Sequence, residues 1–302
     1  MFTVDAPLIG KYQNGNYKVY IFADGTKVRI NGGDFFSAAF PENVDLKITN
    51  KCDMSPLCQY CHENSVADGK HGDILNNPIL KTLHPYTELA IGGGNPFLHP
   101  DFEAFLKQMY EQKVICNVTV NAQQWTDKIT EYQARGLLHG VGVSITSMPD
   151  KATLEHLQQA NVVAHVIVGV VTPEILDKLA TIHPKLLLLG YKLVGRGDAY
   201  YSKHSTPVDD KLEACQSYIR KNRNRFAVVS FDNLALEQLR VKDWVEPEEW
   251  ESFYMGNDGQ HTMYIDAVEN SFAISSTHER IPISPEIRSI DGLFSIVKRM
   301  VM

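Results

Sequence analysis

Residues 49–63 read Thr-Asn-Lys-Cys-Asp-Met-Ser-Pro-Leu-Cys-Gln-Tyr-Cys-His-Glu and place three cysteines, Cys52, Cys58 and Cys61, within ten positions. The 302-residue chain has two further cysteines, Cys116 and Cys215, and both are isolated. An odd count with three members crowded together fits poorly with a disulfide framework and favours metal ligation or redox chemistry. We expect Cys116, which lies inside an apolar run, to be a buried and inert thiol.

The segment before the cysteines is the first of seven short apolar runs that are separated by helix-length spacers. The runs are Asp45–Thr49, Glu88–Gly92, Ile115–Asn121, Val141–Thr146, Val162–Val168, Leu186–Tyr191 and Phe226–Phe231. Helical periodicity is visible in Asp101–Lys113 and in the segment that Pro173 opens. The alternation predicts a parallel α/β sheet, either open and doubly wound or curved into a closed or partial barrel. Ligands of such sheets bind at the carboxyl ends of the strands, where the cysteines lie.

The two ends of the chain are less regular. Tyr17–Phe22 and Thr26–Ile30 predict an antiparallel hairpin, and Thr262–Val268 with Ser271–Ser275 predicts a second one, followed by an amphipathic helix from Ile290. We therefore expect three parts. They are an N-terminal β-hairpin extension (1–43), a βα unit (44–235) and a C-terminal α+β extension that packs on it (236–302).

Composition limits the class of protein. A hydrophobic share of 44% and a charged share of 22% indicate a globular chain, and the formal net charge of −7 argues against a broad surface for nucleic acid. The basic run Arg220–Arg225 is typical of a solvated helix end. No apolar stretch has the roughly 20 residues of a membrane span, and the first residues do not resemble a signal peptide. We expect a cytoplasmic protein without a membrane or nucleic-acid partner.

Three thiolates on one loop can ligate three irons of a [4Fe-4S] cluster and leave the fourth iron open to a ligand. The alternative is a structural zinc site, with His62 or a distant cysteine as the fourth ligand.

The cysteine pattern resembles that of the radical S-adenosylmethionine (radical SAM) enzymes. That family ligates its cluster through Cys-x3-Cys-x-aromatic-Cys after the first strand of a partial (β/α)6 barrel, and the matching residues are Cys52, Cys58, Tyr60 and Cys61. The first gap here holds five residues instead of three. The resemblance implies a [4Fe-4S] cluster on the three cysteines and an adenine contact for Tyr60.

A second motif follows the second apolar run. Residues 91–100 read Ile-Gly-Gly-Gly-Asn-Pro-Phe-Leu-His-Pro and are similar to the Gly-Gly-Glu-Pro turn of the same family, which holds the amino group of SAM. Asn95 stands where the family usually has glutamate. Its carbonyl can accept the same hydrogen bond, but it carries no charge.

Later strand ends carry fainter similarities. The fifth run resembles the adenine-binding Gly-x-Ile-x-Gly stretch, with His165 in place of the first glycine, and Lys192 and Arg196 follow the sixth run in a Gly-rich segment. The SAM contacts implied by the resemblance are Tyr60, Gly93, Gly94, Asn95, Pro96, Asn121, Ser144, Ile167 and Gly169. We expect Lys192 and Arg196 to contact substrate or cofactor; the alternative is a solvated loop held by glycine turns.

The resemblance implies reductive cleavage of SAM to a 5'-deoxyadenosyl radical that abstracts hydrogen, with a flavodoxin or ferredoxin as electron donor. It does not identify a catalytic side chain. The 236–302 tail has no cysteines for an auxiliary cluster. For the substrate we favour a peptide or protein side chain; the alternatives are a small metabolite or nucleotide, or a noncatalytic iron-sulfur or zinc-binding interaction protein.

Overall fold

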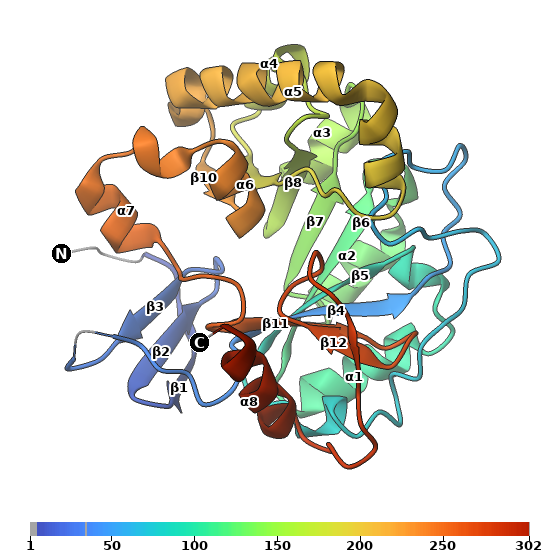
Figure 1. The fold of residues 1–302 in the computed structure, drawn as a ribbon, viewed down its shortest axis with the longest axis vertical. Helices are drawn as coiled ribbons and strands as arrows, with labels where there is room; N and C mark the ends of the chain where they lie inside the picture. Colours follow the sequence, from blue (N-terminus) through green and yellow to red (C-terminus); the bar gives the residue numbers. More distant parts are fainter. Residues whose placement is uncertain (1–4, 34, 302) are drawn as a thin grey trace.

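The computed structural model describes residues 5–33 and 35–301, with a large curved sheet at the centre and a small antiparallel sheet beside it (Figure 1). The strands of the small sheet are β1 (Leu8–Asn14), β2 (Tyr17–Phe22) and β3 (Lys27–Ile30). The strands of the large sheet are β4 (Asn43–Thr49), β5 (Glu88–Gly93), β6 (Ile115–Asn121), β7 (Gly140–Ser144), β8 (Val162–Ile167), β9 (Lys185–Leu189), β10 (Val228–Phe231), β11 (Thr262–Asp266), β12 (Ser271–Ala273) and β13 (Ile281–Pro282).

Strands β4 to β10 lie side by side in chain order and are all parallel, with helices in the connections. The α-helices are α1 (Phe102–Glu111), α2 (Asp127–Ala134), α3 (Lys151–Leu157), α4 (Pro173–Ala180), α5 (Arg196–Asn222), α6 (Asn233–Gln238), α7 (Pro247–Phe253) and α8 (Ile290–Val301). The sheet has two ends, β10 and β13, and therefore does not close. The predicted partial βα barrel is confirmed. None of the described helices is long and apolar enough to cross a membrane.

The two faces of the barrel sheet differ in burial. On β6, Cys116, Val118 and Val120 are buried on the outer side, where α1 packs, whereas Asn117 and Thr119 on the inner side are half-buried. This alternation of apolar and polar residues has the period of two expected of a strand. The hydrophobic core therefore lies between sheet and helices, and the inner face is polar and partly open.

The small sheet contains the predicted hairpin and one strand more. β2 and β3 pair antiparallel across residues 23–26, as predicted, and β1 pairs with the other edge of β2. β1 includes Gly10, where a Cβ atom would lie 2.5 Å from the ring of Tyr86. The expected two-stranded extension is thus a three-stranded sheet, because the first strand is stabilised by contacts with a distant segment that its own pattern does not reveal.

The C-terminal hairpin also goes beyond the prediction. β11 and β12 pair antiparallel as expected, but β11 also pairs in parallel with β4, so the tail extends the barrel sheet. Helix α8, in dark red in Figure 1, returns toward the N-terminal segment, where Lys298 Nζ donates to the carbonyl of Ala38 at 2.7 Å.

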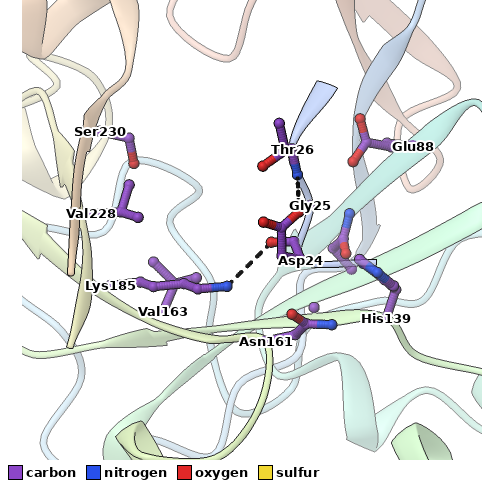
Figure 2. Close-up of a pocket in the computed structure, with 12 residues that line it drawn as sticks. Asp24, Gly25, Thr26, Glu88, His139, Asn161, Val163, Lys185, Val228 and Ser230 are labelled. Atoms are coloured by element: carbon purple, nitrogen blue, oxygen red, sulfur yellow. Dashed lines mark hydrogen bonds between the residues drawn. The ribbon is translucent and has the colours of Figure 1, made fainter. Parts of the chain in front are cut away.

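The turn between β2 and β3 plugs the base of the barrel (Figure 2). His139 Nε2 and Asn161 Nδ2 each lie 3.1 Å from the carbonyl oxygen of Ala23, and Lys185 Nζ donates to the carbonyl of Asp24 at 3.2 Å. Beside the turn remains a cavity of ≈ 360 Å³, lined in part by the first residues of β5, β7, β9 and β10. This cavity lies at the amino ends of the strands, opposite the edge that carries the cysteines.

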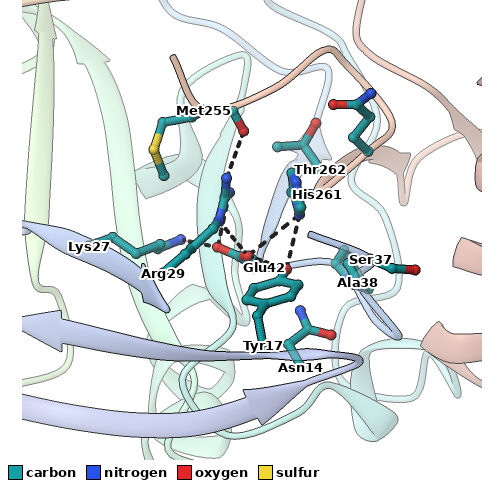
Figure 3. Close-up of polar contacts among 12 residues, drawn as sticks. Asn14, Tyr17, Lys27, Arg29, Ser37, Ala38, Glu42, Met255, His261 and Thr262 are labelled. Atoms are coloured by element: carbon teal, nitrogen blue, oxygen red, sulfur yellow. Dashed lines mark hydrogen bonds and ion pairs between the residues drawn. The ribbon is translucent and has the colours of Figure 1, made fainter. Parts of the chain in front are cut away.

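The buried carboxylate of Glu42 joins the small sheet to the segments that precede β4 and β11 of the large sheet (Figure 3). The Glu42 side chain is 1% exposed and accepts from Arg29 Nε at 2.8 Å and from Tyr17 Oη at 2.5 Å. Lys27 Nζ lies 3.4 Å away. His261 Nδ1, from the loop before β11, lies 3.0 Å from Tyr17 Oη. Because the single Tyr17 hydroxyl hydrogen is directed to Glu42, the Nδ1 atom of His261 is the donor to the Tyr17 oxygen.

We expect His261 to make the fold sensitive to acid. Burial, aided by the charge of Arg29, lowers the pKa of His261 to about 4. A histidine with a lowered folded-state pKa stabilises the protein fully above its unfolded pKa and loses that contribution as the pH falls. The loss amounts to about 3 kcal/mol between about pH 7 and pH 4. Urea unfolding of the cluster-free protein should show a steeper loss for wild type than for His261→Asn. Equal pH slopes would contradict this assignment.

Candidate functional site

The cysteines lie on a loop that begins directly after β4 and closes on itself at a short neck. Cys52 N donates to the carbonyl of Val66 at 2.8 Å, and Val66 N donates to the carbonyl of Asn50 at 3.0 Å. Between these points Cys52, Cys58 and Cys61 are free thiols of intermediate exposure. The neck therefore holds all three thiols at the carboxyl edge of the barrel.

Arg196, at the start of α5, stabilises this loop from the far side. Its Nε donates to the carbonyl of Cys58 at 2.8 Å and its Nη2 to the carbonyl of Ser65 at 2.9 Å. The backbone N–H of Arg196 donates to the carbonyl of Cys61. Gly195 permits this approach, because it has φ +61° and a Cβ there would lie 2.7 Å from the carbonyl of His62. Arg196 thus contacts the cysteine loop, and its guanidinium has no carboxylate partner among the described residues.

The three thiols are close enough to influence one another. Burial raises the pKa of Cys58, and Cys61 and Cys52 raise it further, against the lowering effects of the Tyr60 N–H and of Arg196. Three adjacent thiolates are costly without a cation to compensate them. Within the described part of the chain, no three His, Cys, Asp or Glu side chains converge so as to ligate one metal ion. Cys116 and Cys215 are buried, as expected for Cys116, and burial raises both pKa values, that of Cys215 to about 12.

The glycine turn after β5 lies directly against the cysteine loop. Gly94 N donates to the carbonyl of Thr49 and Asn95 N to the carbonyl of Lys51, both at 2.8 Å. A Cβ on Gly94 would lie 1.9 Å from the Lys51 oxygen, and Gly93 has φ +112°. These glycines therefore allow two backbone segments to meet, so the two sequence motifs form one site. Pro96 begins the short 3-10 helix Pro96–Leu98 that follows.

Asn95 is linked to the cysteine loop by its side chain as well. Its Oδ1 accepts from Phe97 N at 3.1 Å, and its Nδ2 donates to Asp53 Oδ1 at 3.0 Å. Gln124 Nε2 donates to the same Asp53 oxygen at 2.6 Å and lies 3.5 Å from Cys52 Sγ. Burial alone would raise the pKa of Asp53, but the hydrogen bonds from Asn95 and Gln124 lower it overall.

Asp53 and Gln124 are site residues that the sequence analysis missed. Gln124 ends the 3-10 helix Ala122–Gln124, and Asn121 caps this helix in a reciprocal capping box with Gln124. The Asn-x-x-Gln spacing is a recognisable capping pattern. This spacing could have identified Gln124 from the sequence. No local sequence pattern marks Asp53 as a site residue.

Asn121 and Ser144 lie side by side. They occupy paired positions at the ends of β6 and β7. Both line a cavity of ≈ 170 Å³ that also includes Gln123, Met148 and Thr153. Polar side chains at adjacent strand ends can hydrogen-bond a bound ligand.

Tyr60 lies in a small apolar cluster with aromatic residues from the far side of the barrel. Its ring is 4.8 Å from that of Tyr200 and 6.3 Å from that of Tyr191, both edge-on. Ile167 packs against the same cluster. Gly169 has φ +79° and would place a Cβ 2.8 Å from Val208 in that cluster. Tyr60, Ile167 and Gly169 are therefore neighbours, while Tyr191 and Tyr200 were not anticipated.

Lys192 lies in an acidic part of the barrel interior. Its Nζ donates to Ser276 Oγ at 2.8 Å. Burial raises the pKa of Asp45 to about 6, against the lowering charge of Lys192 and with Asp258 and Asp232 adding to the rise. The charge of Lys192 therefore acts on two half-buried carboxyl groups, those of Asp45 and Asp232.

A buried ion network follows the last cysteine. Glu63, whose side chain is 4% exposed, lies 3.0 Å from Lys47 Nζ and 2.8 Å from Arg280 Nη2. Tyr264 Oη donates to Glu63 at 2.8 Å, and Asp266 contacts the same two cations. His62 Nε2 lies 3.3 Å from Glu63 Oε1, and burial together with the Lys192 charge lowers the pKa of His62. Glu63 thus links the end of the cysteine loop to β4 and β11.

His165 lies inside the barrel on β8, against Gly142 of β7. Its buried Nδ1 has no hydrogen-bond partner among the described residues. Burial lowers the pKa of His165 to about 4, so the ring is neutral at neutral pH.

Comparison with known proteins places this geometry in context. No family model matches the sequence. The structure of SuiB from Streptococcus suis bound to S-adenosylmethionine matches with TM-score 0.54 and 13% identity, over 82% of this chain and 64% of that one. SuiB without a named ligand matches with TM-score 0.54 and 12% identity, over 90% of this chain and 82% of that one. The chain has the fold of the radical SAM enzymes.

Two further likenesses are relevant to this radical SAM fold. SuiB bound to the precursor peptide SuiA matches with TM-score 0.53 and 13% identity, over 82% of this chain and 63% of that one. An S-adenosylmethionine-dependent nucleotide dehydratase of Selenomonas ruminantium is 28% identical over 117 residues, which are 37% of this chain and 41% of that protein. The match therefore spans less than half of the dehydratase, and this chain spans about two thirds of the SAM-bound SuiB chain.

The donor set of the cysteine loop fits the iron-sulfur cluster that a radical SAM fold implies. Three free thiols lie on one loop at the carboxyl edge of the barrel, and Gln124 offers an amide N–H to the Cys52 sulfur. Hydrogen bonds to cysteine sulfurs are a usual feature of iron-sulfur sites.

Proposed function

We propose that this chain is a radical SAM enzyme that cleaves SAM reductively and uses the resulting 5'-deoxyadenosyl radical to abstract hydrogen from a substrate. The observation that supports this most is the direct contact between the two motifs. The Asn95 backbone is bonded to Lys51 at 2.8 Å, and its side chain to Asp53 at 3.0 Å. A cysteine site and a glycine turn that form one edge of a βα barrel can hold a cluster and its ligand together.

In this proposal Cys52, Cys58 and Cys61 ligate the [4Fe-4S] cluster, which supplies single electrons to SAM. Arg196 keeps the loop in shape through the Cys58 and Ser65 carbonyls. Flavodoxin or ferredoxin is the expected electron donor. The loop segment 53–57 is mostly exposed, which favours access of such a donor.

The remaining residues would bind and shield SAM. The half-buried side chains of Tyr60 and Ile167 offer apolar surface for the adenine, and Asn121 and Ser144 offer hydrogen bonds at adjacent strand ends. Water must be kept from a carbon radical. The β2–β3 turn occupies part of the base of the barrel and narrows the path for water from that end.

For the substrate we propose a peptide or protein side chain. Among the described residues, β1 and β3 each pair only with β2, so each leaves one edge that an extended segment can join. The SuiB structure with its precursor peptide supports this class. The acidic surroundings of Lys192 favour an uncharged or cationic substrate group.

A nucleotide is the second candidate, favoured by the partial likeness to the nucleotide dehydratase. Against it, Lys47 and Arg280 are already bound to Glu63 and Asp266, and Arg196 to backbone carbonyls. A nucleotide would have to displace one of these contacts or bind its phosphates elsewhere.

The test is anaerobic reconstitution with iron and sulfide, followed by reduction with dithionite in the presence of SAM. We expect 5'-deoxyadenosine and methionine to form only in the reduced sample, as measured by mass spectrometry. Peptide and nucleotide pools are added separately, and the pool whose components change identifies the substrate class. A loaded protein that forms no 5'-deoxyadenosine with either pool would be a noncatalytic iron-sulfur protein.

A further inference from the structure

Asp53 is a carboxylate inside the cysteine loop, next to Cys52. Two amides from other strand ends, Asn95 Nδ2 at 3.0 Å and Gln124 Nε2 at 2.6 Å, donate to it. Both amides use the same oxygen, Oδ1. Beyond the backbone N–H of Asp53 itself, no further donor to this carboxylate is found among residues 5–33 and 35–301, so no other residue occupies Oδ2.

This geometry fixes one oxygen and leaves the other available. The Asp53 side chain is exposed, so its free oxygen is accessible to a ligand. Gln124 Nε2 lies between the Asp53 carboxylate and Cys52 Sγ, at 2.6 Å and 3.5 Å. An oriented carboxylate beside a metal-binding thiol is suited to hold a cationic group of a ligand at that metal.

Asn95 is less suited to that task. Its carbonyl oxygen already accepts the N–H of Phe97, and its NH₂ group is directed to Asp53. The side chain is buried, at 5% exposure, and carries no charge. The negative charge at this corner of the site therefore resides on Asp53 and not on position 95.

We propose that Asp53 binds the α-ammonium group of SAM, and that Asn95 and Gln124 are positioning residues that orient its carboxylate. The inference rests on the proposed function and deepens it. It explains two departures from the family pattern together: the longer gap between Cys52 and Cys58 contains the carboxylate, and the amide at position 95 holds it. Asp53 thereby replaces a charge that would otherwise be missing.

The test is the affinity of the reconstituted [4Fe-4S] protein for SAM, measured by equilibrium dialysis without reductant and expressed per loaded cluster. Asp53→Asn keeps an oxygen that accepts from both amides but removes the charge. We expect it to weaken SAM binding about tenfold or more, which is about 1.4 kcal/mol or more. Asp68→Asn, an exposed position just beyond the neck of the loop, is the matched control and should bind SAM as wild type does.

A second ligand separates a charge contact from a structural role. The analogue of SAM that lacks the α-amino group should bind wild type and Asp53→Asn equally, because it has no ammonium. The double variant Asp53→Asn with Asn95→Glu should regain most of the affinity for SAM, since it moves the carboxylate to position 95. Equal SAM affinity of wild type and Asp53→Asn, equal weakening for the analogue, or no recovery in the double variant would each overturn the inference. A wild type that binds no SAM would overturn the proposed function as well.

Discussion

Cys58→Ala protein is expected to take up no [4Fe-4S] cluster on anaerobic reconstitution. The three thiols lie on one loop with a closed neck, and the isolated thiols Cys116 and Cys215 are buried and cannot replace a lost ligand. Cys58 is the middle ligand, and its carbonyl is also bound to Arg196. Two remaining thiolates would leave half of the irons without a protein ligand. Iron and sulfide content, with the visible absorbance of the cluster, measures the effect.

Cys215→Ala is the matched control for this variant. Its thiol is buried in α5 and far in sequence from the loop, so the variant loses a small apolar group but no proposed ligand. We expect full iron content with a modest loss of stability, on the order of 1 kcal/mol. Full iron content in Cys58→Ala would exclude Cys58 as a ligand.

Glu63→Gln is expected to cost about 3 kcal/mol of unfolding free energy. Glu63 is the carboxylate shared by Lys47 and Arg280, at 3.0 and 2.8 Å, and it also accepts from Tyr264. Without its charge, two cations compete for Asp266 in a part of the wall where Lys47 is 4% exposed. The loss of a partner for a buried charge is costly because water cannot replace it.

Urea unfolding at neutral pH measures this cost. Glu269→Gln is the control, since this exposed glutamate lies near Asp266 in sequence but its side chain has no partner among the described residues. We expect the control to change stability by no more than about 0.5 kcal/mol. If Glu63→Gln unfolds at the same urea midpoint as wild type, other contacts compensate for the loss of the Glu63 charge.

Much of the barrel could be predicted from local pattern. The seven apolar runs correspond to β4 to β10, and Asp101–Lys113 corresponds to α1 (Phe102–Glu111). Each run is recognisable because its buried outer residues alternate with smaller or polar inner ones over a few positions. The two hairpins were equally visible, since a turn and two short strands are local features.

The parts that could not be predicted depend on distant partners. The pairing of β11 with β4 joins Tyr264 to Asp45, and no pattern within either strand specifies the other. The same holds for Glu63, whose partners Tyr264 and Arg280 lie more than two hundred residues away. The same holds for the candidate site. Its cysteines and glycines could be predicted as local motifs, whereas Asp53 is identified only by its hydrogen bonds with Asn95 and Gln124.

The plug at the base of the barrel has a consequence for biosynthesis. The β2–β3 turn leaves the ribosome early, but its hydrogen-bond partners follow it by 116, 138 and 161 residues. At synthesis rates of about 5–20 residues per second, the interval between synthesis of the turn and synthesis of Lys185 is roughly 8 to 30 seconds. During that interval the carbonyl oxygens of Ala23 and Asp24 lack the side chains that bind them in the folded chain. Docking of the β2–β3 turn at the base of the barrel is therefore a late event in the folding of this chain.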